Sequence, residues 1–235
     1  EASVRAEAVR DYWRQQVYPL DDETLEAVLA RWKDVDALGK DVEKLLAKQA
    51  PVQDAASTGA GSLAEVVQRT RQQRRFWLAT LKQGWVQRAD EMQEWLAVIW
   101  ADKKHVARKL VPGQANATRW IETLRCWAAD ETLEPLDLKA GATRLSHSEL
   151  QARFVEAGVS LNIPDCFAEL EALLPALDAL PNPNTPLRLH AAARVFERMQ
   201  QVKSQAGTFG FADMLHRLDT ALDESVQGAK AQRLR

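Results

Sequence analysis

The side chains best suited to bind a ligand are six basic residues in a stretch that carries no acidic one. They lie between Val66 and Ala89 and are Arg69, Arg71, Arg74, Arg75, Lys82 and Arg88. On a helical wheel, Arg71, Arg75 and Lys82 form a stripe roughly 100° from the apolar face. Such stripes on exposed helices bind phosphates without sequence preference. The stretch therefore predicts contact with a nucleic-acid backbone, and a merely solvated helix face is the alternative.

A second basic cluster follows about twenty residues later and includes Lys103, Lys104 and Arg108. We expect these three side chains to add to the same phosphate contacts. The whole chain has 31 Lys plus Arg against 33 Asp plus Glu, a net charge of −2. No global field attracts nucleic acid at this charge, so binding has to rest on local patches.

Eight tryptophans are the most prominent feature of the composition. Exposed tryptophans could stack on bases. However, Trp77, Trp85 and Trp95 fall on the apolar stripe of one predicted helix, and Trp120 and Trp127 recur seven residues apart on another. This spacing favours packing in a core over stacking on a ligand.

The residues that usually carry catalysis are not arranged for it. The sequence contains no G-x-x-x-x-G-K-[ST] phosphate loop, no G-x-G-x-x-G and no H-E-x-x-H. Asp213 and Asp219 are six residues apart, too far to share a helix face closely, and Cys126 and Cys166 read as reduced thiols. We predict no catalytic site, no metal site and no cofactor in this chain, and no binding or hydrolysis of ATP by it.

Helix signals place these residues in an all-α fold, an irregular multi-helix domain with one long, projecting helix. Ser62 and Glu65 form a capping box that opens a helix over 63–101, about 55 Å long, with a bend expected at Gly84. Residues 49–61 read as a flexible connection before it. Other signals predict an N-cap at Asp21 or Asp22, a second capping box at Ser146 and Glu149, a helix end at Gly158, a stop at Pro175 and a cap at Thr185 followed by Pro186.

No apolar run reaches the 18 or so residues of a membrane span, and no signal-peptide pattern is present. These features predict a soluble, cytoplasmic protein that makes no membrane contact. The sequence starts at Glu1 within a helical pattern and ends at Arg235 in a charged stretch, which favours a piece of a longer polypeptide.

Two stretches resemble the RecB family, the beta subunits of exodeoxyribonuclease V among UvrD/Rep-type superfamily-one DNA helicases. The more specific one is 207–222, where Phe211, Asp213, Met214, Leu215, Arg217 and Leu218 match the family's F-x-D-M-L-x-R-L segment before the Walker B strand. The other comprises Tyr12-Trp13-Arg14, Tyr18-Pro19-Leu20, Trp32-Lys33 and Ala50-Pro51-Val52, with Arg119-Trp120-Ile121 and Trp127-Ala128 further on.

The resemblance implies that residues 1–206 form the helical insertion called 1B, and 207–235 the edge of motor domain 1A. The parent would be an ATP-dependent helicase and exonuclease that uses ATP and Mg and works with RecC- and RecD-like subunits in double-strand-break repair and recombination. The insertion would contact duplex DNA, and its two ends, near Tyr12 and Phe211, would lie together. A purely architectural domain that contacts other subunits is the alternative.

Overall fold

The computed structural model describes residues 2–47, 61–102 and 106–207. Every regular element within these ranges is a helix, which confirms the predicted all-α class. The chain divides into two compact units: unit 1 comprises 1–70 with 183–235, and unit 2 comprises 71–182. The sequence patterns predict one domain over 1–206 and do not predict this division.

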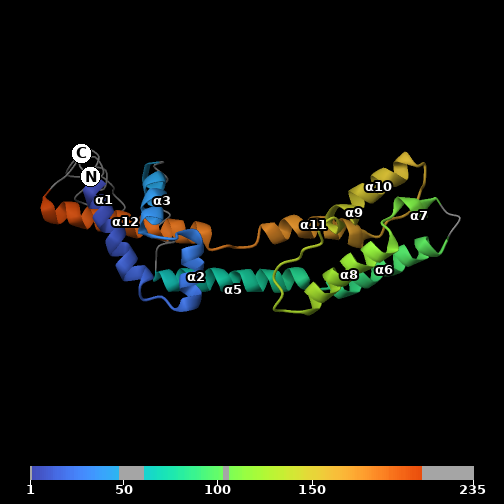
Figure 1. Ribbon diagram of the computed structural model, residues 1–235, viewed down its shortest axis with the longest axis horizontal. Coiled ribbons are helices and arrows are strands. Elements are labelled where there is room, and N and C mark those ends of the chain that lie inside the picture. The colour runs from blue at the N-terminus through green and yellow to red at the C-terminus, as the bar shows by residue number, and fades with distance from the viewer. Residues whose placement is uncertain (1, 48–60, 103–105, 208–235) are drawn as a thin grey trace, which may run out of the picture. The chain divides into compact units, whose positions relative to one another are not determined.

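Unit 1 is built around its first and last described helices. Its helices are α1 (Ala2–Tyr12), a π-helical turn (Trp13–Val17), α2 (Asp22–Arg31), α3 (Val35–Ala47), the start of α5 (Leu63–Lys82) and α12 (Asn184–Ala206). In Figure 1, α1 lies beside α12, and α3 packs against both. The Tyr12 segment thus packs against the helix that precedes Gly207, while Phe211 lies outside the described residues.

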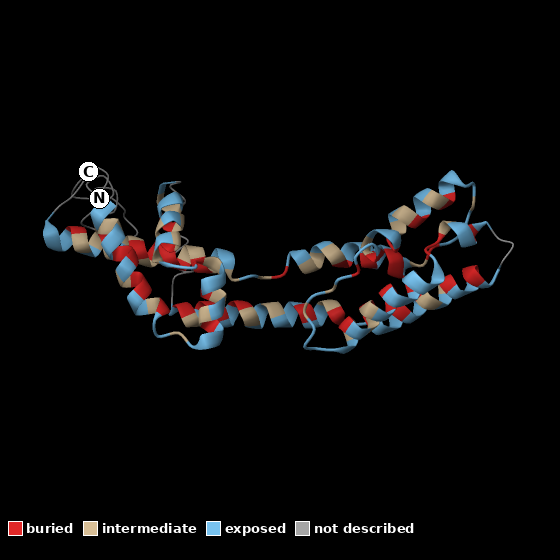
Figure 2. Ribbon diagram, in the orientation of Figure 1, coloured by how far each residue is buried: buried red, intermediate tan, exposed pale blue. Residues whose placement is uncertain are grey.

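Unit 2 is a bundle around α6. It contains the rest of α5, then α6 (Trp85–Ala101), α7 (Ala107–Leu110), α8 (Gln114–Ala129), α9 (Gly141–Arg144), α10 (His147–Glu156) and α11 (Asp165–Asp178). The helix α6 packs along α8 and also contacts α11, and Figure 2 shows buried positions recurring along these helices. The core includes Met92, Leu96, Ile121, Leu124 and Phe167, all fully buried.

Several of the predicted helix boundaries are confirmed by hydrogen bonds at the caps. The Asp21 carboxylate accepts the Thr24 N–H at 2.8 Å. In the first capping box, the Ser62 N–H donates to Glu65 and the Glu65 N–H donates to Ser62. The bend is also confirmed, since Gly84, at φ 77°, separates α5 from α6.

Two predicted boundaries are wrong. Pro175 lies inside α11 and does not end it, because a proline removes only its own N–H bond. The last turn then continues through the Ala179 N–H, which donates to the Pro175 carbonyl at 3.0 Å. The helix α12 begins at Asn184 with Pro183 as its N-cap, two residues before the expected Thr185 cap.

Candidate nucleic-acid interface

The predicted stripe on α5 is not uniformly exposed. Arg75 is exposed and forms no ion pair with any carboxylate of the described residues, whereas Arg71 is half-buried. Lys82 is only 7 % exposed. The prediction that Lys82 lies on a solvent-facing stripe is therefore wrong, and the stripe shortens to Arg71 and Arg75.

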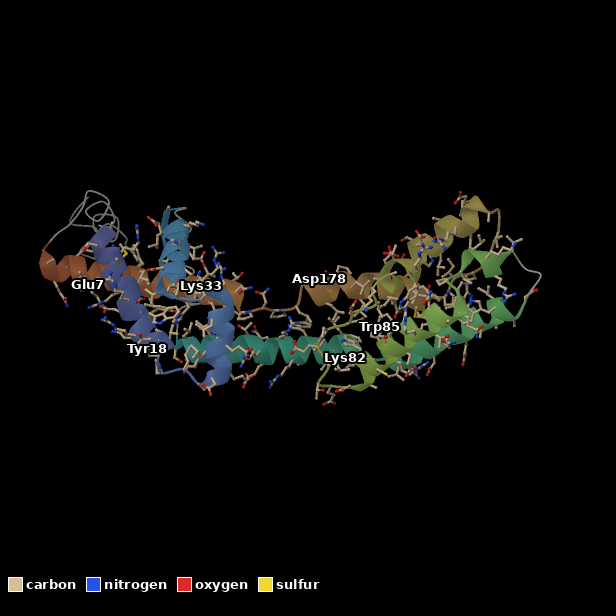
Figure 3. The ribbon with its side chains drawn as sticks, in the orientation of Figure 1. Glu7, Tyr18, Lys33, Lys82, Trp85 and Asp178 are labelled. Atoms are coloured by element: carbon tan, nitrogen blue, oxygen red, sulfur yellow. The ribbon has the colours of Figure 1, made fainter. Side chains whose placement is uncertain are left out.

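Lys82 is buried because a loop from a distant part of the sequence covers it. Its ammonium donates to the backbone carbonyls of Asp130 and Leu133, and lies 5.1 Å from the centre of the Trp127 ring. Asp130 is the C-cap of α8, where a cation is favoured by the unsatisfied carbonyls. Burial lowers the pKa of Lys82, and the carboxylates of Asp130, Glu134 and Glu131 act against that shift. Figure 3 marks Lys82 at the end of α5, just before Trp85.

Two further basic residues of the acid-free stretch are also bound within unit 2. Arg74 Nε donates to Glu134 at 2.8 Å, and its Nη1 donates to the Pro181 carbonyl at 3.3 Å. Arg88 pairs with Glu169 and donates to the Gln83 carbonyl at 3.0 Å. Fewer basic side chains of α5 and α6 are therefore available to a ligand than the sequence alone suggests.

The second basic cluster is described only in part. Arg108 is exposed on α7, and no ion pair joins it to a described carboxylate. Lys103 and Lys104 lie outside the described residues, as does the whole matching segment with Phe211, Asp213, Met214, Leu215, Arg217 and Leu218. The proposed interface thus rests on Arg71, Arg75 and Arg108 among the described side chains.

The tryptophans mainly build cores, as predicted. Trp85, Trp120 and Trp127 are buried, and Trp95 packs edge-on against Phe167 with ring centres 5.1 Å apart. Trp77 is the exception, at 51 % exposed, so its predicted place in the core is wrong. The inner side of α5 is taken instead by Leu78 and Leu81, one and four positions further along.

The groups that most often bind metals or act as nucleophiles were compared among the described residues. No group of three or more His, Cys, Asp or Glu side chains among them could hold a metal ion. Both thiols are kept protonated, since burial raises the pKa of Cys166 to about 12 and a bond to Glu122 raises that of Cys126. A protonated thiol is a poor nucleophile.

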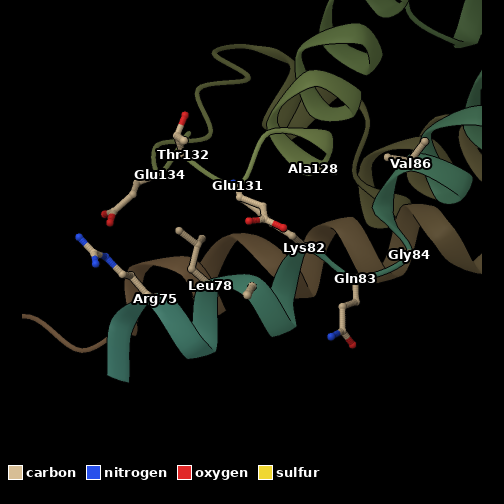
Figure 4. A pocket seen from close by; sticks show the side chains of 11 residues that line it. Arg75, Leu78, Lys82, Gln83, Gly84, Val86, Ala128, Glu131, Thr132 and Glu134 are labelled. Atoms are coloured by element: carbon tan, nitrogen blue, oxygen red, sulfur yellow. The ribbon is translucent and has the colours of Figure 1, made fainter. Parts of the chain in front are cut away.

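An open cavity lies beside Arg75 of the basic stripe. A cavity of about 880 Å³ separates the C-terminal half of α5 from the loop after α8, and Arg75, Leu78, Lys82, Glu131 and Glu134 are among its lining residues (Figure 4). The sequence shows that this loop is rich in acidic residues but does not predict that it lies beside α5.

Comparison with known proteins finds similarity to an enzyme subunit. The chain matches no family model. It is a distant relative of the RecBCD enzyme subunit RecB of Escherichia coli (strain K12), with 29% identity over 230 residues. The match covers 94% of this chain but only 18% of the length of that protein. None of the described helices combines the length and the apolar character that a membrane span requires.

Proposed function

We propose that this chain is a helical, non-catalytic region of a RecB-like subunit and that it contacts the backbone of duplex DNA. The observation that carries this proposal is the similarity to the RecB subunit along 94% of the chain. The exposed side chains of Arg75 and Arg108 support the DNA contact, because neither is paired with a described carboxylate.

In the finer form of the proposal, residues 1–206 are the 1B insertion and 207–235 the edge of motor domain 1A. The parent is then an ATP-dependent helicase and exonuclease of the exodeoxyribonuclease V type, which uses ATP and Mg. It works in the cytoplasm with RecC- and RecD-like subunits in double-strand-break repair and recombination.

The contact is directed at phosphates and not at base edges. A translocating motor has to tolerate every sequence, so base readout would hinder it. The residues proposed for this contact are Arg71, Arg75, Lys103, Lys104 and Arg108. Lys82 is withdrawn from the set, since its ammonium is bound to two backbone carbonyls.

The test is a charge reversal with a matched control. Arg75→Glu with Arg108→Glu should weaken binding to duplex DNA of several unrelated sequences by the same factor, measured by fluorescence anisotropy. The control is Arg14→Glu with Lys33→Glu, which changes the net charge equally at two exposed unit 1 positions with 67% and 83% side-chain exposure. Circular dichroism should show unchanged helicity in both.

An architectural role is the second candidate, favoured by the number of arginines of α5 and α6 already bound within the protein. In that case the two double variants should bind DNA as wild type does. Equal loss in both variants would also count against the proposed interface, because it would reflect net charge alone.

A further inference from the structure

The loop between α8 and α9 is strongly acidic and lies against the basic helix. Four carboxylates, those of Asp130, Glu131, Glu134 and Asp137, occur within eight residues. Loop residues and the C-terminal half of α5 line the same cavity of about 880 Å³ (Figure 4). We call residues 130–137 the acidic strap.

Most of the contacts that hold the strap use its backbone, and the Glu134 carboxylate adds one to Arg74. The Lys82 ammonium binds the carbonyls of Asp130 and Leu133, and the Trp127 indole N–H donates to the Glu134 carbonyl at 3.1 Å. Within the loop, Thr132 donates to the Asp130 carboxylate through its N–H and its hydroxyl, at 2.8 and 2.7 Å. Neutralising Glu131 and Glu134 would therefore leave the backbone attachments in place.

Glu134 pairs with Arg74 of α5, whereas Glu131 acts on this helix only through its nearby charge. Glu134 accepts from Arg74 Nε at 2.8 Å, and both side chains keep some solvent exposure, 43% and 31%. Glu131 is exposed and shares the cavity lining with Arg75. In Figure 4, Arg75 and Glu134 extend to the same side of the cavity, while Glu131 projects toward the Lys82 end of the helix.

We propose that the acidic strap competes with DNA phosphates for Arg74 and that its carboxylates weaken the attraction of nearby Arg75 for phosphate, so that the strap holds the affinity of α5 for DNA low until it is displaced. Partly exposed ion pairs are weak, so a phosphate backbone can displace a glutamate from an arginine. The hydrogen bonds from the Lys82 ammonium to the carbonyls of Asp130 and Leu133 hold the strap beside α5. We call this contact the latch. This inference rests on the DNA contact proposed above and adds its regulation.

The experiment uses the full 235-residue chain and anisotropy titrations with one duplex at several salt concentrations. Glu131→Gln with Glu134→Gln should tighten binding about threefold or more at low salt. It should steepen the salt slope by about 0.9, for the one phosphate contact that Arg74 adds. The control is Glu94→Gln with Glu156→Gln, which removes two exposed carboxylates of unit 2 at the same net charge. It should change the affinity less than twofold.

Lys82→Met gives a second test, in which the expected change in DNA affinity is opposite to that for a residue that contacts phosphate. A residue that merely contacted phosphate would weaken binding when its charge is lost, whereas loss of the latch should tighten binding. If wild type binds DNA and the glutamine variant binds with the same affinity as its control, the proposed competition by the strap is wrong and the proposed function stands. If none of the proteins binds duplex DNA at low salt, the proposed function fails and the strap fails with it. If a folded Lys82→Met protein binds DNA more weakly than wild type, the proposal that Lys82 holds the strap in place is wrong.

Discussion

At the scale of single residues, Trp127 is buried in unit 2 and contacts both the acidic strap and Lys82. Its side chain is 1 % exposed, its indole N–H binds the Glu134 carbonyl, and its ring faces the Lys82 ammonium. Trp77 has the opposite surroundings, since it is exposed and its ring contacts Phe76 edge-on at 5.5 Å between centres. The sequence pattern predicts both tryptophans to lie in a core, but only Trp127 is buried. We therefore expect the two side chains to contribute very differently to stability.

Truncating each of these tryptophans should show that difference. Trp127→Ala should lower the free energy of unfolding by about 3–5 kcal/mol, the usual cost of removing a large buried aromatic side chain. Trp77→Ala should change it by about 0.5 kcal/mol or less, as for an exposed residue. Urea unfolding followed by circular dichroism measures both. A large loss in Trp77→Ala would mean that its indole is covered in solution.

His190 should make the stability of unit 1 depend on pH. Its Nδ1 lies 2.9 Å from the Tyr12 hydroxyl and its Nε2 lies 3.3 Å from the Gly61 carbonyl. A neutral ring satisfies both partners by accepting from Tyr12 and donating to Gly61. Burial, with a smaller effect of nearby Arg194, lowers the pKa of His190, which the Gly61 bond only partly offsets.

The sign follows from proton uptake in the two states. Below about pH 6.5 the unfolded chain binds a proton at His190 that the folded chain does not, so stability falls as pH decreases, by up to about 1.4 kcal/mol per pH unit. His190→Gln keeps one donor and one acceptor but cannot titrate. Denaturant unfolding at pH 7.5 and 5.5 should show a smaller loss in this variant. An equal loss in both proteins would contradict the assignment.

At the scale of elements, the bend between α5 and α6 depends on one backbone conformation. Gly84 has φ 77°, a left-handed conformation that costs a residue with a Cβ about 1–2 kcal/mol. Gly84→Ala should destabilise the chain by about that amount. Gly113→Ala is the matched control, because Gly113 has φ −60° and open space around its Cα. Chemical unfolding of the two variants tests the bend, and equal stabilities would exclude strain at Gly84.

Elements that depend on local sequence could be predicted, and features that depend on distant contacts could not. The capping box at Ser62 and Glu65, the Asp21 cap and the bend at Gly84 follow from the residues themselves. The burial of Lys82 required a loop 48 residues away, and a helical wheel contains no information about that loop. The exposure of Trp77 likewise depends on which leucines the neighbouring elements cover.

For the whole molecule, the candidate interface was only partly predictable. Arg75 and Arg108 are exposed as expected, but Arg74, Lys82 and Arg88 are bound to groups that folding brings near them. The division into two units was also missed, because one of its two boundaries, between Thr70 and Arg71, falls inside the continuous helix α5. The proposed DNA contact rests on the similarity to the RecB subunit, and the burial and ion pairs of the described residues narrow the side chains proposed for it.

The central claim is that this chain binds the DNA backbone through a small set of basic side chains. The most direct test is the salt dependence of duplex binding by the wild-type chain, from anisotropy titrations between 50 and 200 mM salt. With about four phosphates neutralised, the dissociation constant should lie at about 10⁻⁴ to 10⁻⁶ M, and log affinity should fall against log salt with a slope near −3.6. No measurable binding at low salt, or binding that does not respond to salt, would contradict this account.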